Sequence, residues 1–122
     1  MIGFVTIGTN DMPRAVAFYD ALFAVLGAKR ITDNDRFKSW GVTPGAPMVA
    51  VVKPYDEKPA AAGNGNMVAL LMDSRDQVAA LHAKALALGA TDEGAVGLRG
   101  ETFYAGYFRD LDGNKFCAFK SG

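Results

Sequence analysis

The chain has 122 residues, half of them hydrophobic, and its 13 basic and 13 acidic residues cancel to a net charge of zero. This length suits one hydrophobic core, because domains usually hold about 100 to 150 residues, and the composition is typical of a globular protein rather than a disordered or fibrous one. With no basic run longer than Lys29-Arg30, the chain lacks the positive charge on which nucleic-acid binding depends.

No segment of the sequence is typical of export or membrane insertion. The first apolar run meets Asn10, Asp11 and Arg14 too early for a secretory signal, and no apolar run approaches the roughly 20 residues that cross a bilayer. The only cysteine, Cys117, has no partner for an internal disulfide, which agrees with a reducing compartment. We therefore expect a cytoplasmic protein without nucleic-acid or membrane partners.

The first half of the chain predicts a strand followed by a helix. Residues 2–9 are rich in β-formers, and the Asn10-Asp11 pair before Pro13 is a typical helix start. Over residues 12–26 the apolar residues recur at spacings of three and four, which places them on one helical face. These residues are Ala15, Phe18, Tyr19, Leu22, Val25 and Leu26. Gly27 ends the helix.

The second half repeats this order. Met67 to Met72 predicts a strand, and Ser74 followed by Gln77 fits a capping box, in which the two side chains satisfy free backbone amides at a helix start. The apolar face of this second helix contains Val78, Leu81, Ala85 and Leu88, and Gly89 ends it as Gly27 ends the first. The two halves therefore share one plan.

After each helix comes a looser stretch and then a pair of short apolar runs around a turn. Pro44-Gly45 and Asp112-Gly113 supply the backbone angles that tight turns need, so each pair of runs predicts a hairpin. The runs are 37–42 and 48–52 in the first half and 103–109 and 115–119 in the second.

The resulting prediction is a single α+β domain over residues 1–122. It consists of two modules, each a curved mixed sheet covered by one helix, whose helix-free faces enclose a cleft. The first module spans about 1–54, a linker about 55–65 and the second module about 66–122. Side chains alternate along a strand, so Phe4 and Thr6 should face one side of the first strand, and Val5 the other.

Two segments, FVTIGTNDMPRAVAFYDALFAVLGA and YFRDLDGNKFCAF, together with this order of elements, resemble the vicinal oxygen chelate superfamily, which contains glyoxalases, bleomycin-resistance proteins and extradiol dioxygenases. The resemblance covers essentially the whole chain. Its most specific piece is the turn Phe108 to Lys115, similar to the FRDPDGN turn of the family with leucine in place of proline. It implies two βαβββ modules and, in many members, a homodimer.

The resemblance also implies a divalent metal bound by the first and closing strands of each half. Carried over to this chain, the ligand positions fall on Phe4, Met67, Cys117 and near Val49. These residues do not supply the converging nitrogen, oxygen or thiolate donors that such a metal needs, and the only histidine, His82, is predicted on the second helix. We therefore expect no metal cofactor, unless the ligand alignment is displaced or the site uses carboxylates alone.

The resemblance points Cys117 into the cleft, where it is either a reactive thiol, and then the one candidate catalytic residue, or a small buried hydrophobe. Residues expected to line the pocket are Phe4, Thr6, Trp40, Val49, Met67, Tyr104, Tyr107 and Cys117. Arg99 and Glu101 are expected in a loop, either as anchors for a charged ligand or as solvated charges. His82 is expected to serve helix packing rather than catalysis.

Three functions remain open. The first is a protein that binds a small molecule in a metal-free pocket, similar to bleomycin-resistance proteins. The second is a metal-dependent enzyme of the glyoxalase or dioxygenase type, with atypical ligands. The third is a dimeric structural or regulatory protein without catalysis. The fold alone does not choose among them, because function depends on the site.

Overall fold

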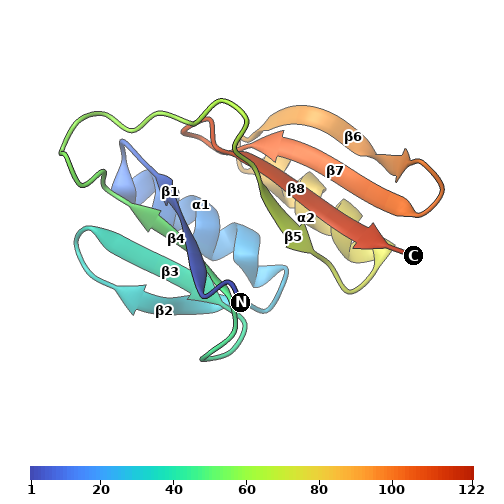
Figure 1. The fold of residues 1–122 in the computed structure, drawn as a ribbon, viewed down its shortest axis with the longest axis horizontal. Coiled ribbons are helices and arrows are strands. Elements are labelled where there is room, and N and C mark those ends of the chain that lie inside the picture. Colours follow the sequence, from blue (N-terminus) through green and yellow to red (C-terminus); the bar gives the residue numbers. More distant parts are fainter.

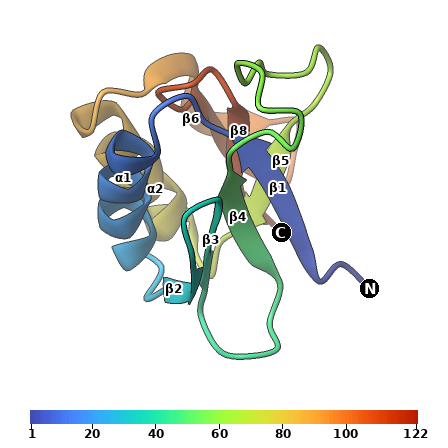
Figure 2. The ribbon, with the colours of Figure 1, turned by 90° about the vertical axis from the view of Figure 1, so that its left-hand side faces the viewer.

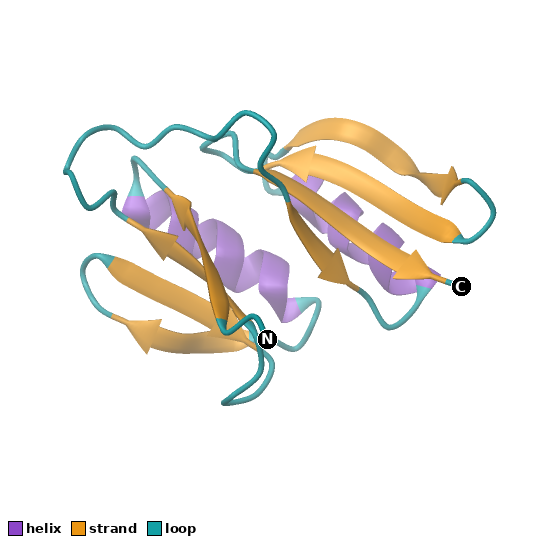
Figure 3. Ribbon diagram, viewed as in Figure 1, coloured by secondary structure: helices purple, strands orange, loops and turns teal.

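The computed structural model describes residues 1–122 and contains two helices and eight strands (Figures 1 and 3). The first module consists of β1 (Phe4–Gly8), α1 (Met12–Ala24), β2 (Lys29–Asp33), β3 (Phe37–Gly41) and β4 (Met48–Val52). The second consists of β5 (Val68–Leu71), α2 (Arg75–Ala87), β6 (Thr91–Arg99), β7 (Phe103–Arg109) and β8 (Lys115–Ser121). This confirms the predicted α+β fold of two βαβββ modules.

Each module forms its own mixed sheet. The strand orders are β1-β4-β3-β2 and β5-β8-β7-β6, in which β1 runs parallel to β4 and β5 parallel to β8, while the other neighbours are antiparallel. The strands β1 and β5 are therefore edges, and they flank the middle of the molecule in Figure 1. The hairpins β3–β4 and β7–β8 are those that the turn residues predict.

Both helices begin at the caps that the sequence predicts. The Asp11 side chain accepts from the Arg14 amide at the start of α1, and Ser74 accepts from the Gln77 amide at the start of α2. The Gln77 side chain in turn accepts from the Asp73 amide at 2.8 Å. These bonds satisfy amides that have no partner inside a helix. Each helix has 13 residues, and neither is long and apolar enough to span a membrane.

The helices lie on one side of the two sheets, as Figure 2 shows, and a single core of 16 buried residues joins the modules. Within it the ring of Tyr19 in α1 contacts Trp40 of its own module and Phe116 of the other. On β1, Val5 packs against this core whereas Phe4 is 52 % exposed. Each sheet thus has a helix-covered face and a helix-free face, which we call its open face.

The turn between β7 and β8 joins the modules. The Asp110 carboxylate accepts from the Tyr19 hydroxyl and from the Asn114 amide, the latter at 2.8 Å. The Asp112 carboxylate accepts from the Thr9 hydroxyl at 2.6 Å and from the Asn10 amide at 3.0 Å. Besides shaping the turn, Asp112 thus binds the residues just before α1, and Asp110 binds Tyr19 within α1. We call this group of residues the module clasp: Thr9, Asn10, Tyr19, Asp110, Asp112 and Asn114.

The looser stretches after the helices are strands, β2 and β6, which no local sequence pattern identifies, although the βαβββ order implied by the resemblance includes them. Both are sheet edges, and β2 is mostly polar, with Lys29, Ile31 and Asp33 exposed, so neither strand shows the apolar run of a central strand. Arg99 was expected in a loop, but it is the last residue of β6 and pairs with Phe103 of β7.

Candidate functional site

A groove runs between the facing edges of β1 and β5. It consists of two adjoining hollows of about 450 and 390 Å³, which share Val5, Met67 and Val68. One end is polar and includes Thr6, Asn66, Asn114 and Lys115, and the other is apolar and includes Ile2, Met48, Ala69 and Leu70. We call it the inter-module groove. Its volume lies in the range of about 300 to 1,000 Å³ that is usual for small-molecule sites.

Beside the groove, Tyr107 of β7 and Cys117 of β8 are cross-strand neighbours on the open face of the second sheet. Cys117 has no exposed surface. Burial raises the pKa of its thiol above the ordinary value, while Tyr107, Arg99 and Lys115 act in the opposite direction. A thiol is a poor nucleophile when protonated, and the only histidine lies on the helix side, so this site favours the small buried hydrophobe over the reactive thiol.

Two cations flank Tyr107. The guanidinium carbon of Arg99 lies 5.5 Å from the ring centroid, and the Lys115 ammonium lies 5.7 Å from it. Neither cation has a carboxylate within 4.0 Å. The open face of the second sheet therefore carries positive charge next to the polar end of the groove, where Lys115 also lies.

The structure brings several of the predicted pocket residues together. Thr6 and Met67 line the inter-module groove. Phe4, Tyr107 and Cys117 occupy the open faces on either side of it.

The other three predicted pocket residues point to the helices. The Trp40 indole donates to Asp20 of α1 at 2.8 Å. The Tyr104 ring lies beneath Arg75 at the start of α2, with the guanidinium carbon 5.1 Å from the ring centroid. Val49 packs into the core, although it borders the apolar end of the groove. Successive side chains of a strand point to opposite faces of the sheet. Which of the two faces is covered by the helix depends on tertiary packing, which the local sequence does not give.

The side chains at the groove do not fit the metal site that the resemblance implies. Phe4 and Met67 carry no suitable donor, and the open face of β4 next to them carries Met48 and Ala50. Cys117 is the one thiolate candidate. Nowhere does the structure gather three histidine, cysteine, aspartate or glutamate side chains, and divalent transition metals need such a set.

His82 has a structural position. It is 6 % exposed on α2, and its Nε2 lies 3.2 Å from an Asp92 carboxylate oxygen and 3.1 Å from the Tyr107 carbonyl oxygen. It thus fixes α2 to β6 and β7 on the face opposite the groove.

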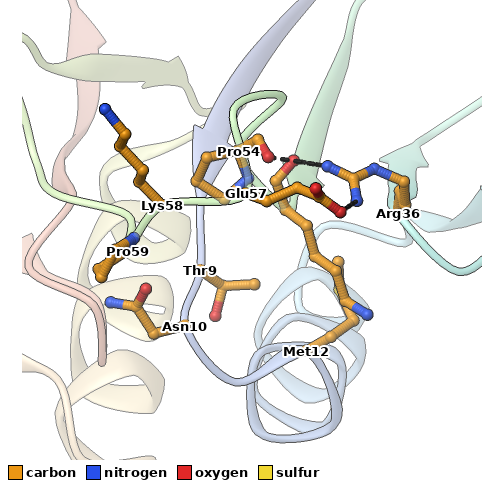
Figure 4. Close-up of a pocket in the computed structure, with 9 residues that line it drawn as sticks. Thr9, Asn10, Met12, Arg36, Pro54, Glu57, Lys58 and Pro59 are labelled. Atoms are coloured by element: carbon orange, nitrogen blue, oxygen red, sulfur yellow. Dashed lines mark hydrogen bonds and ion pairs between the residues drawn. The ribbon is translucent and has the colours of Figure 1, made fainter.

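Another hollow, of about 420 Å³, lies outside the open faces, between the start of α1 and the loop after β4 (Figure 4). Its residues are Thr9, Asn10, Met12, Arg36, Lys53, Pro54, Glu57, Lys58 and Pro59. The Arg36 guanidinium is already engaged, because it donates to the Pro54 carbonyl at 2.8 Å and pairs with Glu57 at 3.7 Å. With one apolar residue in its wall, this hollow offers less to an organic ligand than the groove does.

Comparison with known proteins agrees with this architecture. The family model described as Glyoxalase/Bleomycin resistance protein/Dioxygenase superfamily matches residues 1–118. A glyoxalase/bleomycin resistance protein from Albidiferax ferrireducens T118 is 33% identical, with a TM-score of 0.89, over 100% of this chain and 99% of that one. No functionally curated protein matches the sequence.

More distant structures share the fold. A glyoxalase-related enzyme from Fulvimarina pelagi is 19% identical, with a TM-score of 0.79, over 99% of this chain and 88% of that one. A lactoylglutathione lyase from Agrobacterium tumefaciens is 18% identical, with a TM-score of 0.70, over 98% of this chain and 92% of that one. On the family match over 118 residues and the 33% identity over its full length, the chain belongs to the glyoxalase/bleomycin resistance protein/dioxygenase superfamily.

Proposed function

We propose that this protein binds a small, partly apolar molecule in the inter-module groove without a metal ion. The observation that carries the proposal is the groove itself, which is polar at Thr6 and Lys115 and apolar at Ala69 and Leu70. A ligand with one polar and one hydrocarbon end would match both halves of this surface. The resemblance to bleomycin-resistance proteins supports a binding role.

The donor set supports the metal-free part of this proposal. A metal-dependent glyoxalase or dioxygenase reaction would need ligands that Phe4, Met67 and Cys117 do not provide. We further propose that the protein acts in the cytoplasm, where its single buried cysteine would stay reduced.

Elemental analysis of the purified, untagged protein tests the metal-free part directly. We expect no stoichiometric metal and no rise in melting temperature on adding nickel, zinc, manganese or iron(II), because a ligand that binds only the folded state must raise its stability. A stoichiometric metal, or a clear rise with one of the four ions, would overturn this part and restore the enzyme hypothesis.

A groove-filling variant tests the location. Ala69 is exposed and lines the apolar end, so Ala69→Phe should reduce binding of a neutral aromatic probe, 2-naphthylacetamide, measured by calorimetry. The matched control is Ala83→Phe, which adds the same ring at an exposed position of α2. Equal binding by the wild type and both variants would place the ligand elsewhere.

We also propose that two chains pair through their open faces, so that dimerisation completes the groove. Phe4 and Leu71, from the edge strands of the two sheets, are 52 % and 67 % exposed, which is costly for large apolar side chains in water. A purely structural dimer is the second candidate function. The probe experiment distinguishes it from the ligand-binding function, because a structural dimer would not bind the probe in the groove.

A further inference from the structure

The Arg99 side chain is held in place before any ligand arrives. Its guanidinium donates to the carbonyls of Ala95 at 2.6 Å, Gly97 at 2.9 Å and Ala105 at 3.4 Å. It therefore lies back along its own strand and reaches the ring of Tyr107. A cation fixed in this way loses little rotamer freedom when it binds a ligand, so the entropic cost of binding falls.

Two glycines leave room for this arrangement. A Cβ added at Gly94 would lie 3.0 Å from Tyr107 Cδ2 and 3.3 Å from an Arg99 nitrogen, and one added at Gly97 would lie 3.5 Å from the other nitrogen. A side chain at Gly94 would crowd both Tyr107 and Arg99, whereas one at Gly97 would meet Arg99 at an ordinary contact distance. The guanidinium is thus positioned by both the backbone carbonyls and the absence of neighbouring side chains.

Neither Arg99 nor Lys115 forms an ion pair with a neighbouring carboxylate. Arg109, on the same face of β7, is paired with Glu93 of β6, whereas Arg99 and Lys115 have no carboxylate within 4.0 Å. Both lie beside the same aromatic ring, and Lys115 also lines the groove. Two cations without a carboxylate partner beside one aromatic ring make this part of the surface attractive to an anion.

From this arrangement we infer that the ligand of the groove is an organic carboxylate, whose charged end binds beside Tyr107 within reach of Arg99 and Lys115. The inference rests on the proposed binding function. Three of the five Arg99 N–H donors bond to backbone carbonyls, which leaves one on Nε and one on Nη2 to donate to a carboxylate. Neighbouring strands are about 5 Å apart, so the anion over β7 and β8 and the apolar wall at β5 are separated by roughly 10 Å, the length of a two-ring aromatic acid.

The test compares two probes of the same shape, 2-naphthylacetate and the neutral 2-naphthylacetamide, by calorimetry on the whole protein. The acid should bind wild type about tenfold more tightly than the amide, because charge-assisted hydrogen bonds are about twice as strong as neutral ones. Arg99→Gln and Lys115→Gln should each weaken binding of the acid more than binding of the amide, and so remove most of this difference. Lys84→Gln, at an exposed position of α2, is the matched control.

The affinities of the two probes distinguish a failure of the carboxylate inference from a failure of the proposed binding function. Equal affinity for acid and amide, unchanged in Arg99→Gln, would overturn the carboxylate inference and leave the groove as a binding site. No binding of either probe by the wild type would overturn the proposed function and this inference with it.

Discussion

At the scale of single residues, Tyr19 and His82 occupy equivalent places in the two helices, and each contacts a carboxylate outside its helix. Tyr19 is 1 % exposed, and its hydroxyl donates to Asp110 of the β7–β8 turn. His82 is similarly buried and lies next to Asp92 of β6. Each helix thus buries one polar side chain with a carboxylate partner, as polar groups in a core require.

Tyr19→Phe should lower the free energy of unfolding by about 1 to 3 kcal/mol, because the buried Asp110 carboxylate loses one hydrogen-bond donor. Urea denaturation at pH 7 measures this. Tyr55→Phe, which removes a hydroxyl at a residue 99 % exposed, should have no effect.

The same side chain predicts a pH dependence. Burial, and then the charge of Asp110, raise the pKa of Tyr19 well above its ordinary value of about 10. The unfolded chain therefore releases this proton near pH 10 while the folded protein keeps it. The stability that Tyr19 provides is fully present below pH 10 and is lost above it by up to about 1.4 kcal/mol per pH unit. The loss between pH 9 and 11 should be smaller in Tyr19→Phe than in wild type.

At the scale of elements, the module clasp explains why the β7–β8 turn is the most specific part of the family resemblance. Asp112 alone accepts from Thr9 and Asn10 and pairs with Arg14 at 3.4 Å. Asp112→Ala should therefore destabilise the protein by about 1 to 3 kcal/mol, measured by thermal or urea unfolding. Asp35→Ala, at an exposed position, is the control, and equal stability of the two variants would contradict the role of the clasp.

The contact of α2 with its sheet depends on a glycine. A Cβ added at Gly106 of β7 would lie 2.8 Å from a Val96 methyl and 3.0 Å from the His82 ring. Gly106→Ala should cost about 1 to 3 kcal/mol, because the helix or the neighbouring strand must move. Gly3→Ala meets no atom within 4 Å and should be nearly neutral. A neutral Gly106→Ala would show that this packing is looser than the structure indicates.

At the scale of the whole molecule, the open faces predict the oligomeric state. The chain has a mass of 12.9 kDa, and we expect about twice this value by size-exclusion chromatography with light scattering. Leu71→Glu should shift the protein towards the monomer, because it places a charge among exposed apolar side chains. Tyr55→Glu in the linker should not. A wild-type mass near that of one chain would remove the dimer.

How far the sequence predicts the molecule depends on the range of the interactions involved. Caps at Asp11 and Ser74 and the turn at Asp112-Gly113 act over a few residues, so helices and hairpins were predictable. The side on which Trp40 lies depends on packing against Phe23 of α1, which no local pattern encodes. The sequence names Arg99 as a possible anchor for a charged ligand but places it in a loop, because its edge strand has few apolar residues and no local pattern encodes its fold back along that strand.

The module clasp also bears on how the chain reaches its native state. Residues near Thr9 are synthesised about a hundred residues before Asp112, yet neither end of this contact has its partner until the last turn has formed. Contacts so distant in sequence slow folding and couple its parts. On a ribosome the first module would wait, with the Tyr19 hydroxyl unsatisfied, until the closing hairpin emerged, and we therefore expect the two modules to fold and unfold in a single cooperative step.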